Sequence, residues 1–228
     1  MTLPAPGNPI DMQSINAEFG LGTDLQSYIG ARWYTDAATT GTFTSPIDLS
    51  QFYSKRATSP VAPGSQTFTS SGYFLVPLYA VLTIVLRAGG GGGGGGSGNN
   101  SSGAFGNNGS PSSFSTYGSA QGGFAGGPGG YVGAPGANSD GTPAGGSGGA
   151  GAQGGSAGGA GGSGGKTILT LTNQASGGTG PLTGSYVFVT VGAGGSGGNG
   201  GRWVVLPYSG NAGNGNSGTS GSVDISWS

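Results

Sequence analysis

Residues 86–98 read LRAGGGGGGGGSG, so that a strand-like apolar segment passes through Arg87 directly into eight consecutive glycines. Glycine has the freest backbone conformation of all residues, so a run of glycines at the end of a hydrophobic strand has two interpretations. The glycines are either a flexible linker between two working parts or an ordered structure in their own right. The fold of the whole chain depends on which interpretation holds.

Composition excludes several classes of protein. Glycine supplies 58 of the 228 residues, charged residues only 6%, and the formal net charge is −1. This charge balance predicts neither nucleic-acid binding nor attraction to an anionic membrane surface. No apolar run reaches the roughly 18–20 residues of a membrane span, so membrane insertion is not expected either. The N-terminal MTLPAPGNPIDMQS has neither the basic region nor the apolar core of a signal peptide.

Cysteine and histidine are both absent. Their absence excludes disulfides, a Ser-His-Asp triad and the commonest zinc sites. We therefore expect no cofactor and no metal. The hydrophobic residues make up 33% of the chain and are clustered, which suffices for one small core.

Residues 1–57 form a compositional block that differs from the rest, because most of the charged residues lie in it. Asp11 is placed to cap a short helix through Met12 to Phe19, with Gly20 as its stop. A second helical turn is expected to bury Leu25, Tyr28 and Ile29 before Gly30 ends it. The proline-rich residues 58–65 predict a joint between this block and a second domain, residues 66–228.

Strand-like segments recur in the second domain. They are residues 66–88, 166–173, 185–193, 201–209 and 222–228. The fold class predicted is mainly β, with a small β-sandwich-like core preceded by a short helical or irregular N-terminal segment. The core carries one long glycine-rich insertion, residues 89–165, which has no apolar periodicity.

Within the insertion a period of three residues emerges, as in GGS GGA GAQ GGS from Gly145 onward. Collagen is rejected because its strict G-X-Y repeat and abundant proline are missing. A polyproline-II-like helix also has three residues per turn, and glycine at two of three positions leaves two faces bare for neighbouring helices. We expect a bundle of polyglycine-II helices, whose backbone groups bond to one another. A flexible Gly/Ser linker remains the alternative, although it does not explain the aromatic residues inside the insertion.

Four separated elements of the second domain occur in an order that resembles a known family. They are SGYFLVPLYAVLTIVLRAGGGGGGG (71–95), GGKTILTLT (164–172), YVFVTVGAGGSGGNGG (186–201) and GTSGSVDISWS (218–228). The series resembles the glycine-rich domain at the ends of bacteriophage tail fibres and related virion proteins. The block INAEFG … LQSYIG … IDLSQFYSK is likewise similar to short N-terminal segments of phage structural proteins.

The resemblance implies an adhesin at the distal end of a virion tail, in which loops on layered polyglycine-II helices contact a host receptor, either an outer-membrane protein or a polysaccharide. Its other partners would be tail proteins, and it would be a homo-oligomer such as a trimer, or a monomeric cap on a trimeric fibre. The candidate receptor-binding residues are aromatics, amides and one acid of the insertion, a composition typical of recognition loops. They are Asn99, Asn100, Phe105, Asn107, Asn108, Phe114, Tyr117, Phe124, Tyr131, Asn138 and Asp140. The candidate residues for attachment to the virion are Ile15, Phe19, Tyr28, Trp33, Leu49, Phe52 and Tyr53.

Enzymatic activity is not expected, and no catalytic residue is assigned. Asp140 and Asp224 are the only acids after residue 48, whereas glycoside cleavage needs two carboxyl groups brought together in a cleft. Arg87 and Arg202 border glycine runs, where a guanidinium can bond exposed carbonyls. Trp203 and Trp227 are expected in the core.

Two other functions remain open. One is a purely structural minor tail protein with the same fold, whose loops contact other tail proteins. The other is a silk-like surface-layer protein, which would be expected to carry an export signal.

Overall fold

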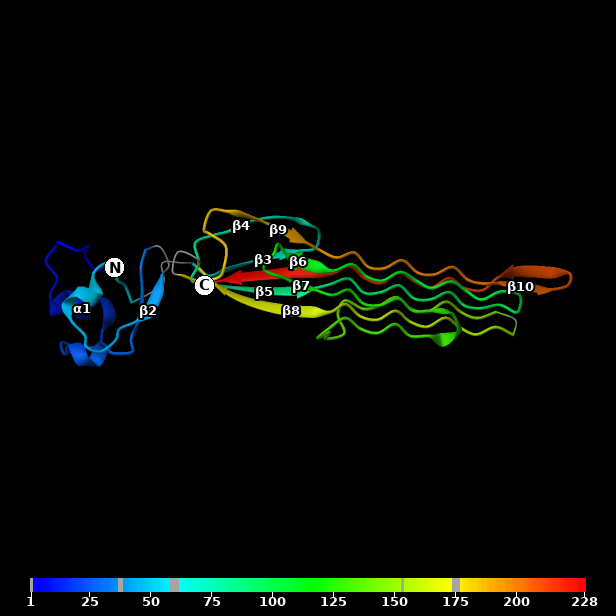
Figure 1. Cartoon of the computed structure of the whole chain (residues 1–228), viewed down its shortest axis with the longest axis horizontal. Helices are drawn as coiled ribbons and strands as arrows, with labels where there is room; N and C mark the ends of the chain where they lie inside the picture. Colours follow the sequence, from blue (N-terminus) through cyan, green and yellow to red (C-terminus); the bar gives the residue numbers. More distant parts are fainter. Residues whose placement is uncertain (1, 37–38, 58–61, 153, 174–176) are drawn as a thin grey trace.

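The computed structural model describes all residues except 1, 37–38, 58–61, 153 and 174–176. The fold is mainly β, with antiparallel sheets and one short N-terminal α-helix, as predicted. Three parts follow one another along an elongated molecule: an N-terminal block, a β core and a rod of extended glycine-rich segments (Figure 1). Part of the predicted proline-rich joint, residues 58–61, lies outside the described residues.

The N-terminal block forms the short elements that its capping residues predict. In α1 (Met12–Phe19) the Asp11 side chain accepts a 2.7 Å hydrogen bond from the Ser14 amide, and Gly20 ends the helix at φ 72°. Asp24 and Asp48 cap two 3₁₀ turns in the same way. The remaining elements are η1 (Leu25–Tyr28), β1 (Arg32–Tyr34), β2 (Thr40–Thr42) and η2 (Leu49–Phe52).

This block has a hydrophobic core of its own, so the expectation of a single core was wrong. The Phe43 and Phe52 rings stack with centroids 4.2 Å apart, and Tyr28 meets Phe52 edge-on. The buried residues of the cluster are Leu3, Ile15, Tyr28, Phe43, Ile47 and Phe52. Ile29, predicted to be buried, is 40% exposed. Aromatic rings bury enough area each for a cluster this small to hold the block together.

The β core consists of two four-stranded antiparallel sheets that share one hydrophobic cluster. Strand β5 shows the pattern, because Leu82, Ile84 and Leu86 are fully buried while the residues between them are half-exposed. The first sheet has the order β3 (Gly64–Phe68), β12 (Ser222–Trp227), β5 (Val81–Arg87), β8 (Lys166–Thr172). The second has the order β4 (Gly72–Leu75), β9 (Tyr186–Thr190), β6 (Ser112–Phe114), β7 (Gly118–Ala120).

Two strand predictions need correction. The insertion 89–165 contains the β6–β7 hairpin, which belongs to the core and was not predicted. Conversely, residues 201–209 are not a core strand, because β10 (Arg202–Val205) pairs only with β11 (Tyr208–Asn211). This hairpin lies at the far end of the rod (Figure 1). Trp203 therefore lies outside the core, whereas Trp227 packs against it as expected.

The rod is a direct continuation of the core strands. Segment 89–97 leaves β5, and a second long excursion, residues 192–221, leaves β9 and returns into β12. The glycine-rich region therefore extends beyond the predicted insertion. The segments that join core strands to the rod are 89–97, 104–110, 121–127, 156–165, 192–201 and 212–221. Two further segments, 131–137 and 144–152, follow the 3₁₀ turn η3 (Pro128–Gly130) and a turn at the base of the rod.

Segment 89–97 lies at the centre of the rod, and its amides bond to three different neighbours in turn. Gly89, Gly92 and Gly95 donate to segment 104–110. Gly90, Gly93 and Gly96 donate to 213–219, and Gly91, Gly94 and Ser97 donate to 156–162, with distances of 2.8–3.0 Å throughout.

The carbonyls of the same segment accept from three other neighbours. Segment 121–127 donates through Gly123 and Gly126 to the carbonyls of Gly89 and Gly92. Segment 144–152 donates through Gly146 and Gly149 to those of Gly91 and Gly94. Segment 192–201 donates through Gly195, Gly198 and Gly201 to those of Gly90, Gly93 and Gly96. Among the described residues, the central segment therefore has six hydrogen-bonded neighbours, all from the same chain. Segment 89–97 is therefore an ordered structure and not a flexible linker, because every amide from Gly89 to Ser97 is paired.

Close approach of the backbones makes glycine necessary at the centre. A Cβ on Gly92 would lie 1.9 Å from the Ser196 carbonyl oxygen, and one on Gly95 would lie 1.9 Å from that of Asn199. These are main-chain atoms of hydrogen-bonded neighbours, which cannot move without breaking the pattern around them.

We expect Gly92→Ala to lower the free energy of unfolding by about 2 kcal/mol or more, because overpacking here displaces paired backbones. Ala160→Ser, at an exposed position of the neighbouring segment, is the matched control and should change stability by less than about 0.5 kcal/mol. Chemical denaturation of both variants measures the difference. Equal stabilities would contradict close packing at Gly92.

Candidate functional site

The far end of the rod carries the β10–β11 hairpin, which presents apolar side chains to solvent. Arg202 pairs with Asn211 at its base and Val205 with Tyr208 at its turn. Leu206 is 88% exposed and Tyr208 71% exposed. Large exposed side chains on a tight turn are typical of binding loops rather than of structural turns.

The hairpin is held firmly at its base. The Asn99 side chain pairs with the backbone of Val204, donating from Nδ2 to the carbonyl at 3.1 Å and accepting from the amide at 2.9 Å. The amides of Asn100 and Ser101 donate to the Arg202 carbonyl. Two of the predicted receptor-binding residues, Asn99 and Asn100, therefore lie at the tip and brace the hairpin.

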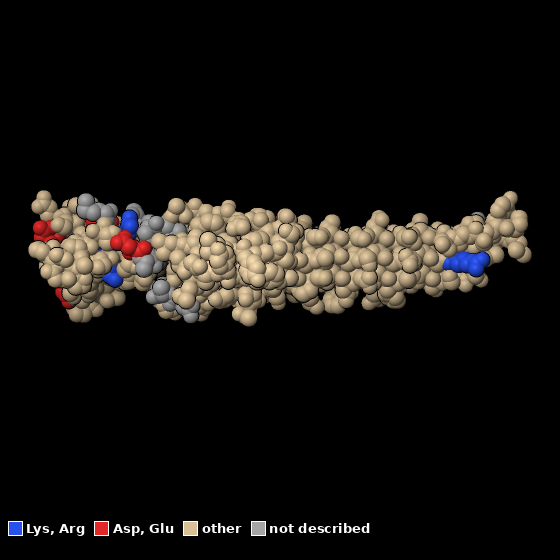
Figure 2. All heavy atoms as spheres, turned by 90° about the horizontal axis from the view of Figure 1, so that it is seen from above, with Lys and Arg blue, Asp and Glu red and all other residues tan. Residues whose placement is uncertain are grey.

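The rod and its tip are almost without charge. Between Ala88 and Gly165 the only charged residue is Asp140, and between Val191 and Gly221 the only one is Arg202. Arg202 is exposed, and no ion pair holds its guanidinium within the described chain. Figure 2 shows an uncharged surface along the rod with a basic group near its far end. The tip thus combines apolar area with a single positive charge.

A groove on the side of the rod collects four other predicted residues. Phe105, Asn108, Phe124 and Tyr131 line it, together with glycine and alanine, and its volume is about 480 Å³. The ring centroids of Phe105 and Tyr131 lie 6.2 Å apart. Asn107 lies outside this groove and donates from Nδ2 to Ser196 Oγ at 2.6 Å.

The remaining predicted receptor-binding residues lie elsewhere. Phe114 is fully buried in the core, and Tyr117 packs against the same cluster. Both belong to the unpredicted β6–β7 hairpin, so they are removed from the candidate surface. Asn138 and Asp140 lie in the turn at the base of the rod, at the opposite end from the tip. The structure therefore divides the predicted set among tip, groove, core and base.

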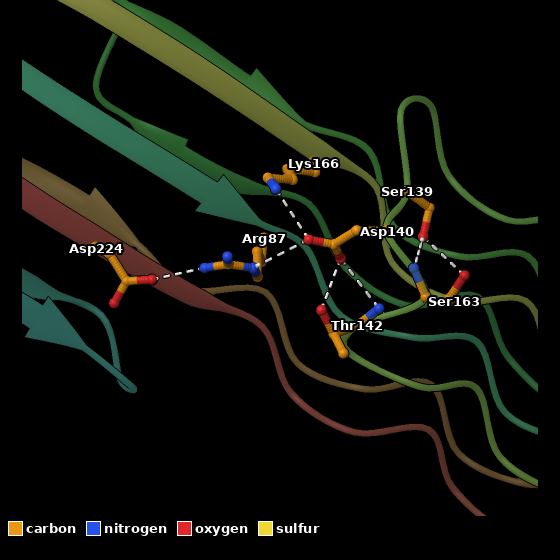
Figure 3. Close-up of polar contacts among 8 residues, drawn as sticks. Arg87, Ser139, Asp140, Thr142, Ser163, Lys166 and Asp224 are labelled. Atoms are coloured by element: carbon orange, nitrogen blue, oxygen red, sulfur yellow. Dashed lines mark hydrogen bonds and ion pairs between the residues drawn. The ribbon is translucent and has the colours of Figure 1, made fainter.

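The base of the rod is tied to the core by a chain of charges (Figure 3). Asp140 Oδ2 lies 3.0 Å from Lys166 Nζ and 3.8 Å from Arg87 Nε. Arg87 also donates to Asp224 on β12 at 2.6 Å, and Thr67 on β3 donates to the same carboxylate at 2.8 Å. The expectation that Arg87 bonds carbonyls was wrong, because its guanidinium reaches two carboxylates instead.

The pKa of Asp140 is held well below its usual range. The largest cause is a hydrogen bond from the Thr142 hydroxyl, followed by the hydrogen bond from Lys166 and one from the Thr142 amide. A carboxyl group favoured in its charged form by fixed donors anchors a turn rather than transferring protons. Asp140 is therefore a structural residue of the rod base.

The predicted attachment residues are largely the core of the N-terminal block. Ile15, Tyr28 and Phe52 are fully buried there, so their side chains cannot contact a partner. Phe19, Trp33 and Tyr53 are half-buried, and only Leu49 is exposed, at 36%. Leu21 and Ile29, at 44% and 40%, are exposed apolar side chains of the same block that the sequence did not indicate.

Within the described residues no group of acidic side chains is placed to hold a metal ion. The described chain likewise contains no helix that is long and apolar enough to cross a membrane. Comparison with protein-family models, curated proteins and solved structures found no match to this chain.

The tip hairpin was missed in the sequence because its composition is that of a core strand. The residues WVVLPYS are apolar and β-branched or aromatic, as strands of the core are. The available signal was their position between two glycine-rich runs, 192–201 and 212–221. A strand pair at the end of two rod segments lies one rod length away from the core.

Asp140→Asn should lower the melting temperature at neutral pH, because the charged carboxylate is the form that its donors favour. Since its folded-state pKa is below the ordinary value of 3.8, this contribution is present above that pH and is lost as the pH falls below it. The difference between wild type and variant should therefore shrink below pH 3.8. Thermal denaturation across pH measures it, and a constant difference would contradict the charge-based anchor.

Proposed function

We propose that this protein is a non-enzymatic bacteriophage tail-fibre or tail-tip receptor-binding protein, and that its rod is a polyglycine-II bundle. The observation that carries the proposal is the exposed β10–β11 hairpin at the end of a nearly uncharged rod in which every amide of the central segment is paired. The resemblance of four chain elements to the glycine-rich domains of tail fibres supports it.

The polyglycine-II assignment is supported by the direction of the hydrogen bonds. Successive amides of segment 89–97 bond to three neighbours and then repeat, and the carbonyls follow the same rule with three others. A helix with three residues per turn and no internal bonds distributes its backbone groups in this way. A pleated strand would bond to two neighbours only.

The proposed adhesion depends on a stiff rod that holds the exposed side chains of the tip at a fixed site. Leu206 and Tyr208 provide apolar contact area, and Arg202 provides one charge, at a site fixed by the Asn99 brace. A fixed site loses little conformational freedom on binding, so more of the contact energy appears as affinity. Several copies on one virion would add avidity. The receptor would be an outer-membrane protein or a polysaccharide of the host surface.

The N-terminal block would attach the protein to other tail proteins at the distal end of the virion. Its exposed apolar residues Leu21, Ile29 and Leu49 are better placed for this than the buried aromatics. All six neighbours of the central segment come from one chain. This favours a monomeric cap on a fibre over a trimer in which three chains share the rod.

Amide hydrogen exchange of the intact protein tests the bundle. We expect slow exchange from Gly89 to Ser97, because each of these amides donates to a neighbouring carbonyl. The Leu206 amide, in the turn between β10 and β11, donates to no described residue and should exchange quickly, so it serves as the internal reference. Random-coil rates across 89–97 would show a flexible tether and would overturn the rod.

Tyr208→Ala tests adhesion, because a tyrosine at the centre of an interface commonly carries much of its energy. We expect virions with this variant to assemble normally and to adsorb to their bacterial host at least about tenfold more weakly. Tyr73→Ala on β4 is the matched control, since Tyr73 is 67% exposed but lies on the core.

Adsorption unchanged by both Tyr208→Ala and Leu206→Asp would overturn the tip as the receptor contact. Failure of the tip variants to assemble into virions would instead favour the alternative, a structural minor tail protein whose tip contacts other virion components.

A further inference from the structure

The groove on the side of the rod is built by three neighbouring segments. Segment 121–127 forms its floor, because it bonds on one side to 104–110 through Gly106 and Gly109. On the other side Phe124 and Gly127 donate to the carbonyls of Ala134 and Tyr131 in segment 131–137. The volume of about 480 Å³ lies within the range of ligand sites, roughly 300–1,000 Å³.

Three aromatic rings line this groove and remain open to solvent. Phe105 is 62% exposed, Tyr131 63% and Phe124 41%. The Phe105 ring rests on the backbone of Gly127, where an added Cβ would lie 2.5 Å from its Cε1. The Tyr131 ring meets Phe105 at an interplanar angle of 64°. The rings are therefore positioned by their neighbours but not buried by them.

Two hydrogen-bond donors of the groove have no partner among the described residues. Asn108 Oδ1 accepts from the Ala125 amide at 2.8 Å, which fixes the orientation of the side-chain amide. Its Nδ2 group donates to no other described residue, and neither does the Tyr131 hydroxyl. The groove thus combines aromatic rings with two polar groups, one of them fixed, the combination typical of a small-molecule site.

The groove has no charge. The only charged residues in the glycine-rich segments are Asp140 at the base and Arg202 at the tip. An ionised ligand would lose hydration here without gaining a counter-charge. An apolar helix packed over the groove would bury Asn108 Nδ2 without a partner, which costs free energy. The occupant that fits is neutral, with apolar faces and hydroxyl groups.

We propose that this groove is a second binding site, separate from the tip, for a neutral hexose oligosaccharide. The C–H groups on one face of a pyranose carry partial positive charge and stack on the negative face of an aromatic ring. Its hydroxyl oxygens accept from Asn108 Nδ2 and Tyr131. Phe105 and Asn108 are one turn apart, about 9 Å in a three-residue helix, so the groove accommodates more than one sugar ring.

The site goes beyond adhesion through the hairpin. Contacts along the side of the rod would hold the protein against surface glycans while the tip searches for its receptor. Weak binding is sufficient for this purpose, because many copies on one virion act together.

NMR titration of the full-length protein with neutral gluco-, galacto- and manno-oligosaccharides at millimolar concentration tests the proposal. We expect at least one of the three to shift the ring signals of Phe105, Phe124 and Tyr131. Phe105→Ala should weaken that binding about tenfold, and Tyr131→Phe, which removes only the hydroxyl, a few-fold. Tyr73→Ala, at a similarly exposed position on β4 of the core, is the control and should leave the affinity unchanged.

Three results would overturn the site: no shift with any of the three sugars, equal binding by Phe105→Ala, or equal competition by an oligogalacturonate or an apolar peptide. The two proposals fail separately. Loss of host adsorption in Tyr208→Ala with intact sugar shifts supports both, whereas sugar binding without any tip-dependent adsorption leaves only the groove.

Discussion

The structure depends on pairing the backbone of segment 89–97. A glycine run gives up more conformational freedom on ordering than any other sequence, and it has no side chains whose burial offsets the loss. Hydrogen bonds are what remains, each contributing about 0.5–1.5 kcal/mol net. Three of the six neighbours around the central segment accept from its amides, Gly89 to Ser97, and the other three donate to its carbonyls. The same pattern requires the backbones to approach so closely that no side chain fits between them.

The β core makes this arrangement possible by setting the register before the rod begins. Strands β5, β8, β9 and β12 enter the rod directly, so the neighbours of the central segment arrive already aligned. The apolar cluster between the sheets supplies the burial that the rod lacks. Asp140 adds an electrostatic tie, because its carboxylate joins the turn at the rod base to Lys166 and Arg87. A rod that starts from fixed positions loses less entropy when it forms.

Because the centre of the rod has no side chains, the side chains available for binding lie on its surface and at its far end. The hairpin exposes the apolar side chains of Leu206 and Tyr208, and hydrogen bonding to Asn99 holds it in place. The aromatic groove around Phe105 lies along the side and is uncharged. These two surfaces differ in chemistry, so the proposed contact with a receptor at the tip and the proposed contact with neutral sugars along the rod would be independent uses of one scaffold. The N-terminal block, with its own aromatic core, leaves Leu21, Ile29 and Leu49 exposed, and these are the residues proposed for attachment.

Much of the fold was predictable from local patterns. The caps at Asp11 and Gly20 predict α1, and the β-branched residues of 81–87 predict a strand, because both signals act within a few residues. The period of three in the glycine tract predicted segments that bond to one another. The sequence by itself thus determined the mainly β class of fold, the near absence of charge from the glycine-rich segments and the lack of thiol and imidazole groups. Only the tertiary structure decided that Phe114 is buried while Phe105 is exposed, and that WVVLPYS lies at the tip. Both outcomes depend on which segments become neighbours although they lie far apart in the sequence, and apolar composition is the same in a core strand and in an exposed hairpin.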